Sequence, residues 1–201
     1  IRREMQDELI SLQTKFHMTI VFITHDLNEA LKLGDRIAIM RDGEIVQEGT
    51  PEQIVTTPAN NYVADFVQDV SRTKVIRVNS IMKPPQSIIH ESQSTDKAME
   101  TINETNTYSA FLVGQDQILK GILTRDELVT LSKNPIENLI DFSATKVECA
   151  HPDSYIDQII PMAARTEYPI PVIDDQGHLI GQVDRGSLLE GMVKDTELLL
   201  K

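Results

Sequence analysis

The second part of the chain contains an internal repeat with a constant offset of sixty residues. The repeated positions pair Ser94 with Ser154, Tyr108 with Tyr168, Gly121 with Gly181, Arg125 with Arg185 and Leu128 with Leu188. No gap interrupts the register across these pairs. A repeat of this length predicts two copies of one supersecondary unit that bury a face against each other.

Local signals predict the same elements in both copies. They are a helix capped by Ser94 or Ser154, a strand at 110–113 or 170–173, a turn at 114–117 or 174–177, a second strand, and a closing helix from Glu127 or Ser187. The predicted fold class is α/β.

The first part of the chain has a different pattern. Residues 19–23 form a continuous β-branched and apolar run, which predicts a strand buried on both faces of a parallel sheet. Thr24, His25 and Asp26 follow it directly, and open α/β sheets place their ligands at the carboxyl ends of strands. We expect Asp26 to cap a helix at 27–33.

Helices and a hairpin are predicted around this strand. Apolar residues at helical spacing predict a surface helix within 1–17 and a short helix after residue 61. Two short strands at 36–40 and 44–48 flank a turn that contains Gly43. Thr50 then begins a helix, with Gln53 as its capping-box partner.

Composition limits the classes of partner and site. The formal net charge is −12, with the acidic excess spread over both parts of the chain, so we expect no nucleic-acid partner and no direct membrane insertion. The single cysteine, Cys149, excludes an internal disulfide. The five histidines show no metal-ligand spacing, so no metal site is predicted. The chain begins with Ile1 rather than Met, and we expect it to be a fragment of a longer protein.

Residues 1–71 resemble the C-terminal part of the nucleotide-binding domain of ABC transporters. Thr24-His25-Asp26 matches the switch-histidine motif of that family, and the segment from Asp35 through Pro51 matches the part that closes the domain. The resemblance implies ATP and Mg²⁺ as cofactors and His25 as a catalytic residue that donates to the γ-phosphate. No phosphate-loop pattern occurs in the sequence, so we expect the fragment alone to be inactive.

Residues 58–70 resemble a narrower group, the ATPase subunits of quaternary-amine importers for glycine betaine, carnitine, choline and proline betaine. This resemblance implies a homodimer that works with a transmembrane permease and a substrate-binding protein. It also implies a cytoplasmic location at the inner face of the cell membrane, reached through the permease.

The repeat itself resembles a tandem pair of CBS domains, at 75–133 and 134–195, and this resemblance implies a βαββα order in each copy. The resemblance rests on the segments 121–128 and 181–188, and it implies adenosine-containing ligands. Copy 1 keeps the hydroxyl and the acid that the family uses, at Thr124 and Glu127, whereas copy 2 has Asp184 and Ser187 instead. A pair that binds no ligand and only dimerises or couples domains stays open as an alternative.

The importer resemblance further implies cyclic di-AMP as a regulatory ligand of copy 2, shared across a dimer axis. The predicted ligand-binding residues are Val147, Cys149, Tyr168, Ile170, Gln182, Asp184 and Arg185. Tyr168 offers an aromatic face to an adenine, and Arg185 can pair with a phosphate. Asp184 would repel that phosphate unless it accepts a hydrogen bond from an adenine amine.

Two other functions stay open on the sequence alone. The chain can be a stand-alone ligand-sensing module whose first segment only dimerises. It can also belong to another ABC importer, for methionine or a sugar, that carries the same CBS pair.

Overall fold

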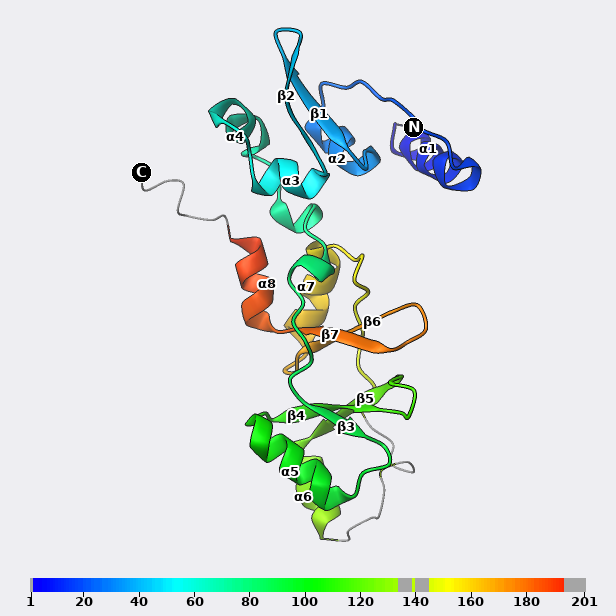
Figure 1. Ribbon diagram of the computed structural model, residues 1–201, viewed down its shortest axis with the longest axis vertical. Helices are drawn as coiled ribbons and strands as arrows, with labels where there is room; N and C mark the ends of the chain where they lie inside the picture. The colour runs from blue at the N-terminus through cyan, green and yellow to red at the C-terminus, as the bar shows by residue number, and fades with distance from the viewer. Residues whose placement is uncertain (1, 134–138, 140–144, 194–201) are drawn as a thin grey trace. The chain divides into compact units, whose positions relative to one another are not determined.

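The computed structural model describes residues 2–133, 139 and 145–193. The chain divides into two compact units, Ile1–Val75 and Ile76–Lys201. Figure 1 labels the helices and strands of each unit.

The first unit contains mainly helices and one hairpin. Its elements are α1 (Arg2–Phe16), α2 (Leu27–Leu33), β1 (Ile37–Arg41), β2 (Glu44–Gly49), α3 (Pro51–Thr56), α4 (Asn61–Val67) and the 3₁₀ helix η1 (Arg72–Lys74). Strands β1 and β2 pair antiparallel, and α3 packs against β2 and α4. Ile54 and Val63, on α3 and α4, are fully buried in this unit.

Local sequence signals in this unit are confirmed. Asp26 accepts a hydrogen bond from the backbone N–H of Asn28 and caps α2. Thr50 and Gln53 form the expected capping box at the start of α3. Gly43 has φ +86° in the hairpin turn, a left-handed conformation that glycine adopts without strain.

The prediction of a buried strand at 19–23 is wrong. These residues form no strand, and Val21 and Ile23 expose 87% and 93% of their surface. A strand exists only where a neighbouring strand completes its backbone hydrogen bonds. None of the strands that the structure describes pairs with this segment.

The second unit contains both copies of the repeat. Its elements are η2 (Val78–Ser80), β3 (Ile88–His90), α5 (Thr95–Thr105), β4 (Ser109–Val113), β5 (Leu119–Thr124), α6 (Arg125–Ser132), α7 (Ile156–Arg165), β6 (Ile170–Ile173), β7 (Leu179–Val183) and α8 (Arg185–Met192). Copy 1 therefore has the predicted βαββα order. In copy 2 an isolated parallel bridge from Ala150 to Val172 occupies the place of the first strand.

The two copies form separate small sheets. In copy 1, β4 lies between β3, which is parallel to it, and β5, which is antiparallel. In copy 2, β6 and β7 pair antiparallel. Each sheet carries its own two helices, α5 and α6 in copy 1 and α7 and α8 in copy 2 (Figure 1).

Three helix starts differ from the prediction. Helices α6 and α8 begin at Arg125 and Arg185, because Thr124 and Asp184 serve as their N-caps. Helix α7 begins after Tyr155 and is not capped by Ser154. The carbonyl of Ser154 accepts a hydrogen bond from Val78 instead.

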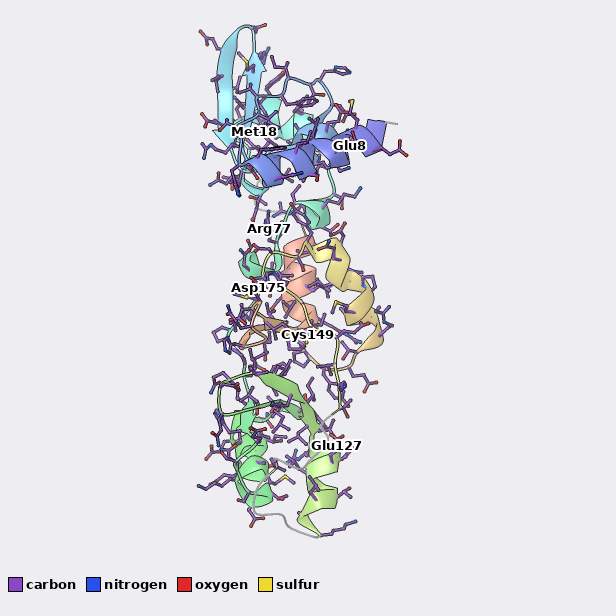
Figure 2. The ribbon with its side chains drawn as sticks, turned by 90° about the vertical axis from the view of Figure 1, so that its right-hand side faces the viewer. Glu8, Met18, Arg77, Glu127, Cys149 and Asp175 are labelled. Carbon is purple, nitrogen blue, oxygen red and sulfur yellow. The ribbon has the colours of Figure 1, made fainter. Side chains whose placement is uncertain are left out.

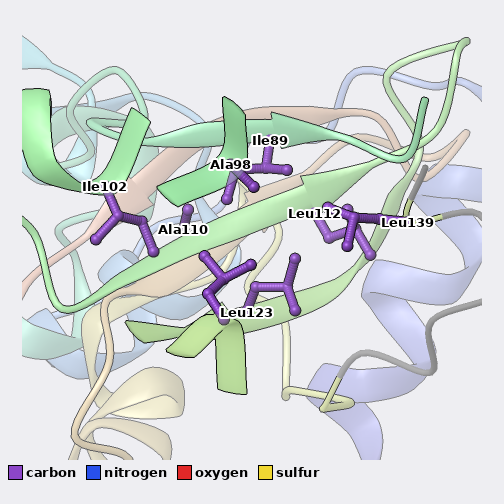
Figure 3. Close-up of a cluster of buried hydrophobic side chains, with 8 residues drawn as sticks. Ile89, Ala98, Ile102, Ala110, Leu112, Leu123 and Leu139 are labelled. Atoms are coloured by element: carbon purple, nitrogen blue, oxygen red, sulfur yellow. The ribbon is translucent and has the colours of Figure 1, made fainter. Parts of the chain in front are cut away.

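The core of copy 1 lies between its sheet and its two helices. Figure 3 shows the cluster, which comprises Ile89, Ala98, Ile102, Ala110, Leu112, Leu123, Leu128 and Leu139. Leu139 lies beyond the end of α6 along the chain, yet its side chain is fully buried in this core.

The copies exchange segments. The stretch before β3 pairs with copy 2, where Lys83 and Gln182 exchange both backbone hydrogen bonds, at 2.9 and 2.8 Å. The stretch after α6 pairs with copy 1, where Ile122 N–H donates to Thr145 O at 3.1 Å. Residues 122 and 182 are sixty positions apart, so the exchange follows the repeat.

The two hairpin turns also bond reciprocally. Leu119 N–H donates to Gly177 O at 3.0 Å, and Leu179 N–H donates to Gln117 O at 3.1 Å. Both donors and both acceptors are related by the sixty-residue offset. The two copies are therefore related by an approximate two-fold axis that passes between these turns.

Candidate ligand-binding site

A cleft of about 560 Å³ lies between the two copies within the second unit. It is lined by residues 86–87, 106–111, 124–126, 167–169 and 182. Most of the lining comes from copy 1, and the 167–169 segment and Gln182 come from copy 2.

Tyr108 and Tyr168 occupy equivalent positions, each just before a strand. Asn106, with φ +50°, ends α5 in a left-handed conformation and turns the chain toward Tyr108. Tyr168 N–H donates to the Thr166 hydroxyl at 3.1 Å. The cleft thus has one aromatic side chain from each copy, and Tyr108 is 81% exposed.

Gln182 is the most buried polar side chain in the lining, with 2% of its surface exposed. Its Oε1 accepts a hydrogen bond from the backbone N–H of Gln86 at 3.0 Å. Its Nε2 has no hydrogen-bond partner among the residues that the structure describes. The equivalent residue in copy 1 is Ile122.

The acid of copy 1 is engaged at the start of α6. Oε2 of Glu127 accepts from the backbone and the hydroxyl of Thr124, each at 2.7 Å. Oε1 of the same carboxylate accepts from the Thr145 hydroxyl at 3.1 Å, so it also binds the exchanged segment. Figure 2 labels Glu127 on this helix.

Copy 2 forms the corresponding helix start with the two residue types interchanged. Oδ1 of Asp184 accepts from the Ser187 backbone N–H at 2.7 Å and from its hydroxyl at 3.0 Å. These donors, with the ammonium of Lys83 at 3.8 Å, lower the pKa of Asp184 below its ordinary range. Asp184 therefore has a structural role as a helix cap.

Of the seven predicted ligand-binding residues, Tyr168 and Gln182 line the cleft. Val147, Cys149, Ile170, Asp184 and Arg185 are not among its lining residues. Nη2 of Arg185 donates to Thr166 O at 2.8 Å and to Ala163 O at 3.4 Å. The guanidinium thus holds the end of α7 and the segment that leads to Tyr168.

The remaining predicted residues lie near the β6 strand and the segment before it. Ile170 is buried and pairs with Val183 in the copy 2 sheet. Cys149, labelled in Figure 2, is half-buried, and its thiol contacts the Val147 carbonyl at 3.6 Å. Burial raises the pKa of the Cys149 thiol, which keeps it in the unreactive neutral form.

Sequence reasoning missed several lining residues, above all Tyr108, Arg125 and Asp126 of copy 1. The repeat contained the signal, because Tyr108 and Arg125 are the counterparts of Tyr168 and Arg185. Among the described lining residues, Asp126 and Glu167 supply two acidic groups and Arg125 one basic group. The cleft therefore has a slightly negative lining.

His25 belongs to the first unit and is exposed. Its neighbours are held by hydrogen bonds: the Thr24 hydroxyl donates to buried Glu29 at 2.8 Å, and Asp26 N–H donates to that hydroxyl at 3.0 Å. The Nε2 of Gln6, on α1, donates to the other Glu29 oxygen at 2.9 Å. This network fixes the loop on which His25 faces solvent.

Two kinds of feature are absent from the part of the chain that the structure describes. Within it, no three or more His, Cys, Asp or Glu side chains gather in a group that could hold a metal ion. No helix in the same residues combines the length and the apolar character that a membrane span requires.

Comparison with known proteins identifies relatives of both units. A family model described as CBS domain matches residues 67–134 and 139–194. The glycine betaine/carnitine transport ATP-binding protein GbuA of Listeria monocytogenes is 40% identical over 191 residues, which cover 95% of this chain and 48% of the relative. The glycine betaine transport ATP-binding protein OpuAA of Bacillus subtilis is 34% identical, over 99% of this chain and 47% of the relative.

The chain spans about half the length of these curated relatives. Among solved structures, the CBS-pair protein CBSX2 from Arabidopsis thaliana has a TM-score of 0.51 and 21% identity, over 57% of this chain and 92% of that chain. That likeness concerns the fold alone. Together the matches confirm the predicted resemblance to a CBS pair and to quaternary-amine transport ATP-binding proteins.

Proposed function

The chain belongs to the CBS domain family, and we propose that it is the C-terminal part of an ATP-binding subunit of an osmoprotectant ABC importer whose CBS pair regulates transport. The observation that carries the proposal is the 40% identity to a glycine betaine/carnitine transport ATP-binding protein over 95% of this chain. The match includes the first unit as well as the CBS pair. A chain that shared only the CBS pair would match from about residue 67 onward.

In this proposal residues 1–71 are the end of the motor domain, which hydrolyses ATP with Mg²⁺. The chain contributes His25, whose imidazole N–H can donate to the γ-phosphate and stabilise negative charge that develops during transfer. His25 is exposed on a loop that is anchored by Glu29. This position suits a side chain that contacts an ATP molecule bound by other parts of the motor domain.

The partners follow from the same proposal. Two copies of the subunit close on ATP as a homodimer and drive a transmembrane permease that receives glycine betaine, carnitine or choline from a substrate-binding protein. The subunit then lies in the cytoplasm, at the inner face of the membrane, and the permease holds it there.

The test uses the complete polypeptide that carries this chain, assembled with its permease and binding protein in proteoliposomes. We expect glycine betaine uptake coupled to ATP hydrolysis, and we expect His25→Ala to lower turnover by about 100-fold or more while ATP binding persists. His17→Asn is the control, because His17 is exposed and Asn tolerates its φ of +50°. Equal turnover in wild type and His25→Ala would remove His25 from the mechanism.

We further propose cyclic di-AMP as the ligand by which the CBS pair inhibits transport. Tyr168 offers its ring to an adenine, and a two-fold symmetric ligand suits an isologous contact between two chains. Arg185 supports the site by holding the Thr166 carbonyl, two residues before Tyr168. Val147, Cys149, Ile170 and Asp184 are not among the lining residues, and we propose them as supporting residues.

Titration calorimetry on the 201-residue chain tests this ligand. We expect one cyclic di-AMP for every two chains, no comparable binding of AMP, and loss of binding in Tyr168→Ala. Arg185→Ala should weaken binding, because the segment before Tyr168 loses its anchor. Equal affinity for AMP, or no heat with cyclic di-AMP, would contradict the proposal and leave the transport experiment unaffected.

A further inference from the structure

The side-chain oxygen of Gln182 has a hydrogen-bond partner, whereas its side-chain nitrogen has none among the residues that the structure describes. Its Oε1 accepts from the Gln86 backbone N–H, a group that can only donate, so the oxygen and nitrogen of the amide are unambiguously placed. Nε2 is therefore the end of the amide that Gln86 does not engage. Nε2 is buried, lacks a partner among the described residues, and belongs to a side chain that lines the cleft.

The fold does not require a polar side chain at this position. Ile122 occupies the equivalent place in copy 1 with 1% exposure and makes the equivalent backbone hydrogen bond, to Thr145 instead of Lys83. A buried donor without a partner lowers stability relative to an apolar side chain of the same size. The amide of Gln182 thus lowers the stability of the fold, whereas Ile122 does not.

We propose that Gln182 determines ligand specificity by donating a hydrogen bond from Nε2 to an acceptor nitrogen of a purine ring in the cleft. The inference rests on the proposed regulatory function and adds the residue that reads the base. Tyr168 lines the same cleft and offers an aromatic face. A ring with a lone-pair nitrogen at its edge satisfies the amide, whereas a purely hydrocarbon ring leaves it unpaired.

The first test compares the affinity of the chain for cyclic di-AMP in wild type, Gln182→Met and Gln176→Met. We expect Gln182→Met to raise Kd by about tenfold, the effect of losing one buried neutral hydrogen bond. Gln176→Met, in an exposed turn, should leave Kd unchanged. Equal Kd in wild type and Gln182→Met would overturn the inference and leave the ligand proposal in place, whereas no binding by wild type would overturn both.

A second test begins with the wild-type chain, in which no substitution can disturb folding. Analogues of cyclic di-AMP with 1-deaza, 3-deaza or 7-deaza bases each lack one acceptor nitrogen. We expect one of them to bind wild type about tenfold more weakly than the parent, and we expect this difference to vanish in Gln182→Met. In wild type, the side-chain amide NMR signals of Gln182 should shift on saturation with cyclic di-AMP.

Either of two results would contradict the role of Gln182. Equal affinity of wild type for cyclic di-AMP and for all three analogues would show that the site contacts no ring nitrogen. A deaza penalty that persists in Gln182→Met would assign the contact to another donor.

Discussion

At the scale of single residues, the equivalent helices α6 and α8 are capped with the acidic residue at different positions. Copy 1 places a hydroxyl at the N-cap and an acid three residues later, at Thr124 and Glu127. Copy 2 places the acid at the N-cap and the hydroxyl three residues later, at Asp184 and Ser187. In both, the acid also contacts the exchanged segment, through Thr145 or Lys83.

This arrangement predicts a pH dependence. The Ser187 donors and Lys83 lower the pKa of Asp184 in the folded state, so its charged form stabilises the fold above the unfolded-state pKa of about 4. That contribution disappears as pH falls through the depressed folded-state pKa. We expect Asp184→Asn to lower the free energy of unfolding by about 0.3–1 kcal/mol at pH 7, the usual size of a charge effect at a helix N-terminus.

Urea unfolding of wild type and Asp184→Asn between pH 2 and pH 7 measures this difference. Asn can still accept the Ser187 hydrogen bonds, so the substitution removes mainly the charge. The two proteins should converge in stability at the acid end of the range. A difference that stays constant down to pH 2 would show that the Asp184 charge is not its source.

At the scale of elements, helix α8 packs tightly against the segment that the other copy contributes. A Cβ atom on Gly191 would lie 2.8 Å from Ile156 Cδ1 and 2.9 Å from Ile81 Cγ2. Ile156 begins α7, and Ile81 belongs to the stretch before β3, so three elements meet at this glycine.

We expect Gly191→Ala to destabilise the second unit by about 1–3 kcal/mol, because overpacking outweighs the gain in helix propensity that alanine normally gives. Thermal or urea unfolding measures the change. Glu190→Ala is the matched control on the exposed side of the same helix, and it should change stability by less than about 0.5 kcal/mol. Stabilisation by Gly191→Ala would mean that α8 is free to move away from Ile81.

The elements also show what the sequence could predict. Helices with their own caps, such as those after Thr50 and Ser94, and the hairpin turns were predicted because their determinants are a few residues apart. The apolar run at 19–23 was misread because a strand depends on distant partners that its own sequence does not name. The lack of a described partner for Gln182 Nε2 could not be predicted either, because it depends on the position of Gln86 in the fold.

At the scale of the whole molecule, the chain consists of two units with separate sets of contacts, Ile1–Val75 and Ile76–Lys201. In the second unit the Ile76 carbonyl accepts a hydrogen bond from the backbone N–H of Ile156, so the contacts of this unit begin at its first residue. The repeat predicted a self-contained C-terminal part, because each copy supplies an apolar face for the other.

Limited trypsin digestion followed by mass spectrometry tests this independence. We expect early cleavage after Arg72 or Lys74 and a resistant fragment that retains Ile76 and everything needed for the second unit. The first unit should be digested faster at Lys15 and Lys32, the trypsin sites that flank the segment 19–23, because that segment forms no strand and its side chains are largely exposed. Simultaneous digestion of both parts would contradict the independence of the second unit.

The exchange of segments between the copies has a consequence for the history of the fold. A polypeptide with a single copy could bury its core only by taking the missing segment from a second molecule, so its smallest folded form would be a dimer. Duplication and fusion of such a polypeptide would preserve every contact while turning association into an intramolecular step. Once the halves share one chain, each can mutate without altering the other, and the difference between Ile122 and Gln182 is a change that a dimer of identical chains could not make.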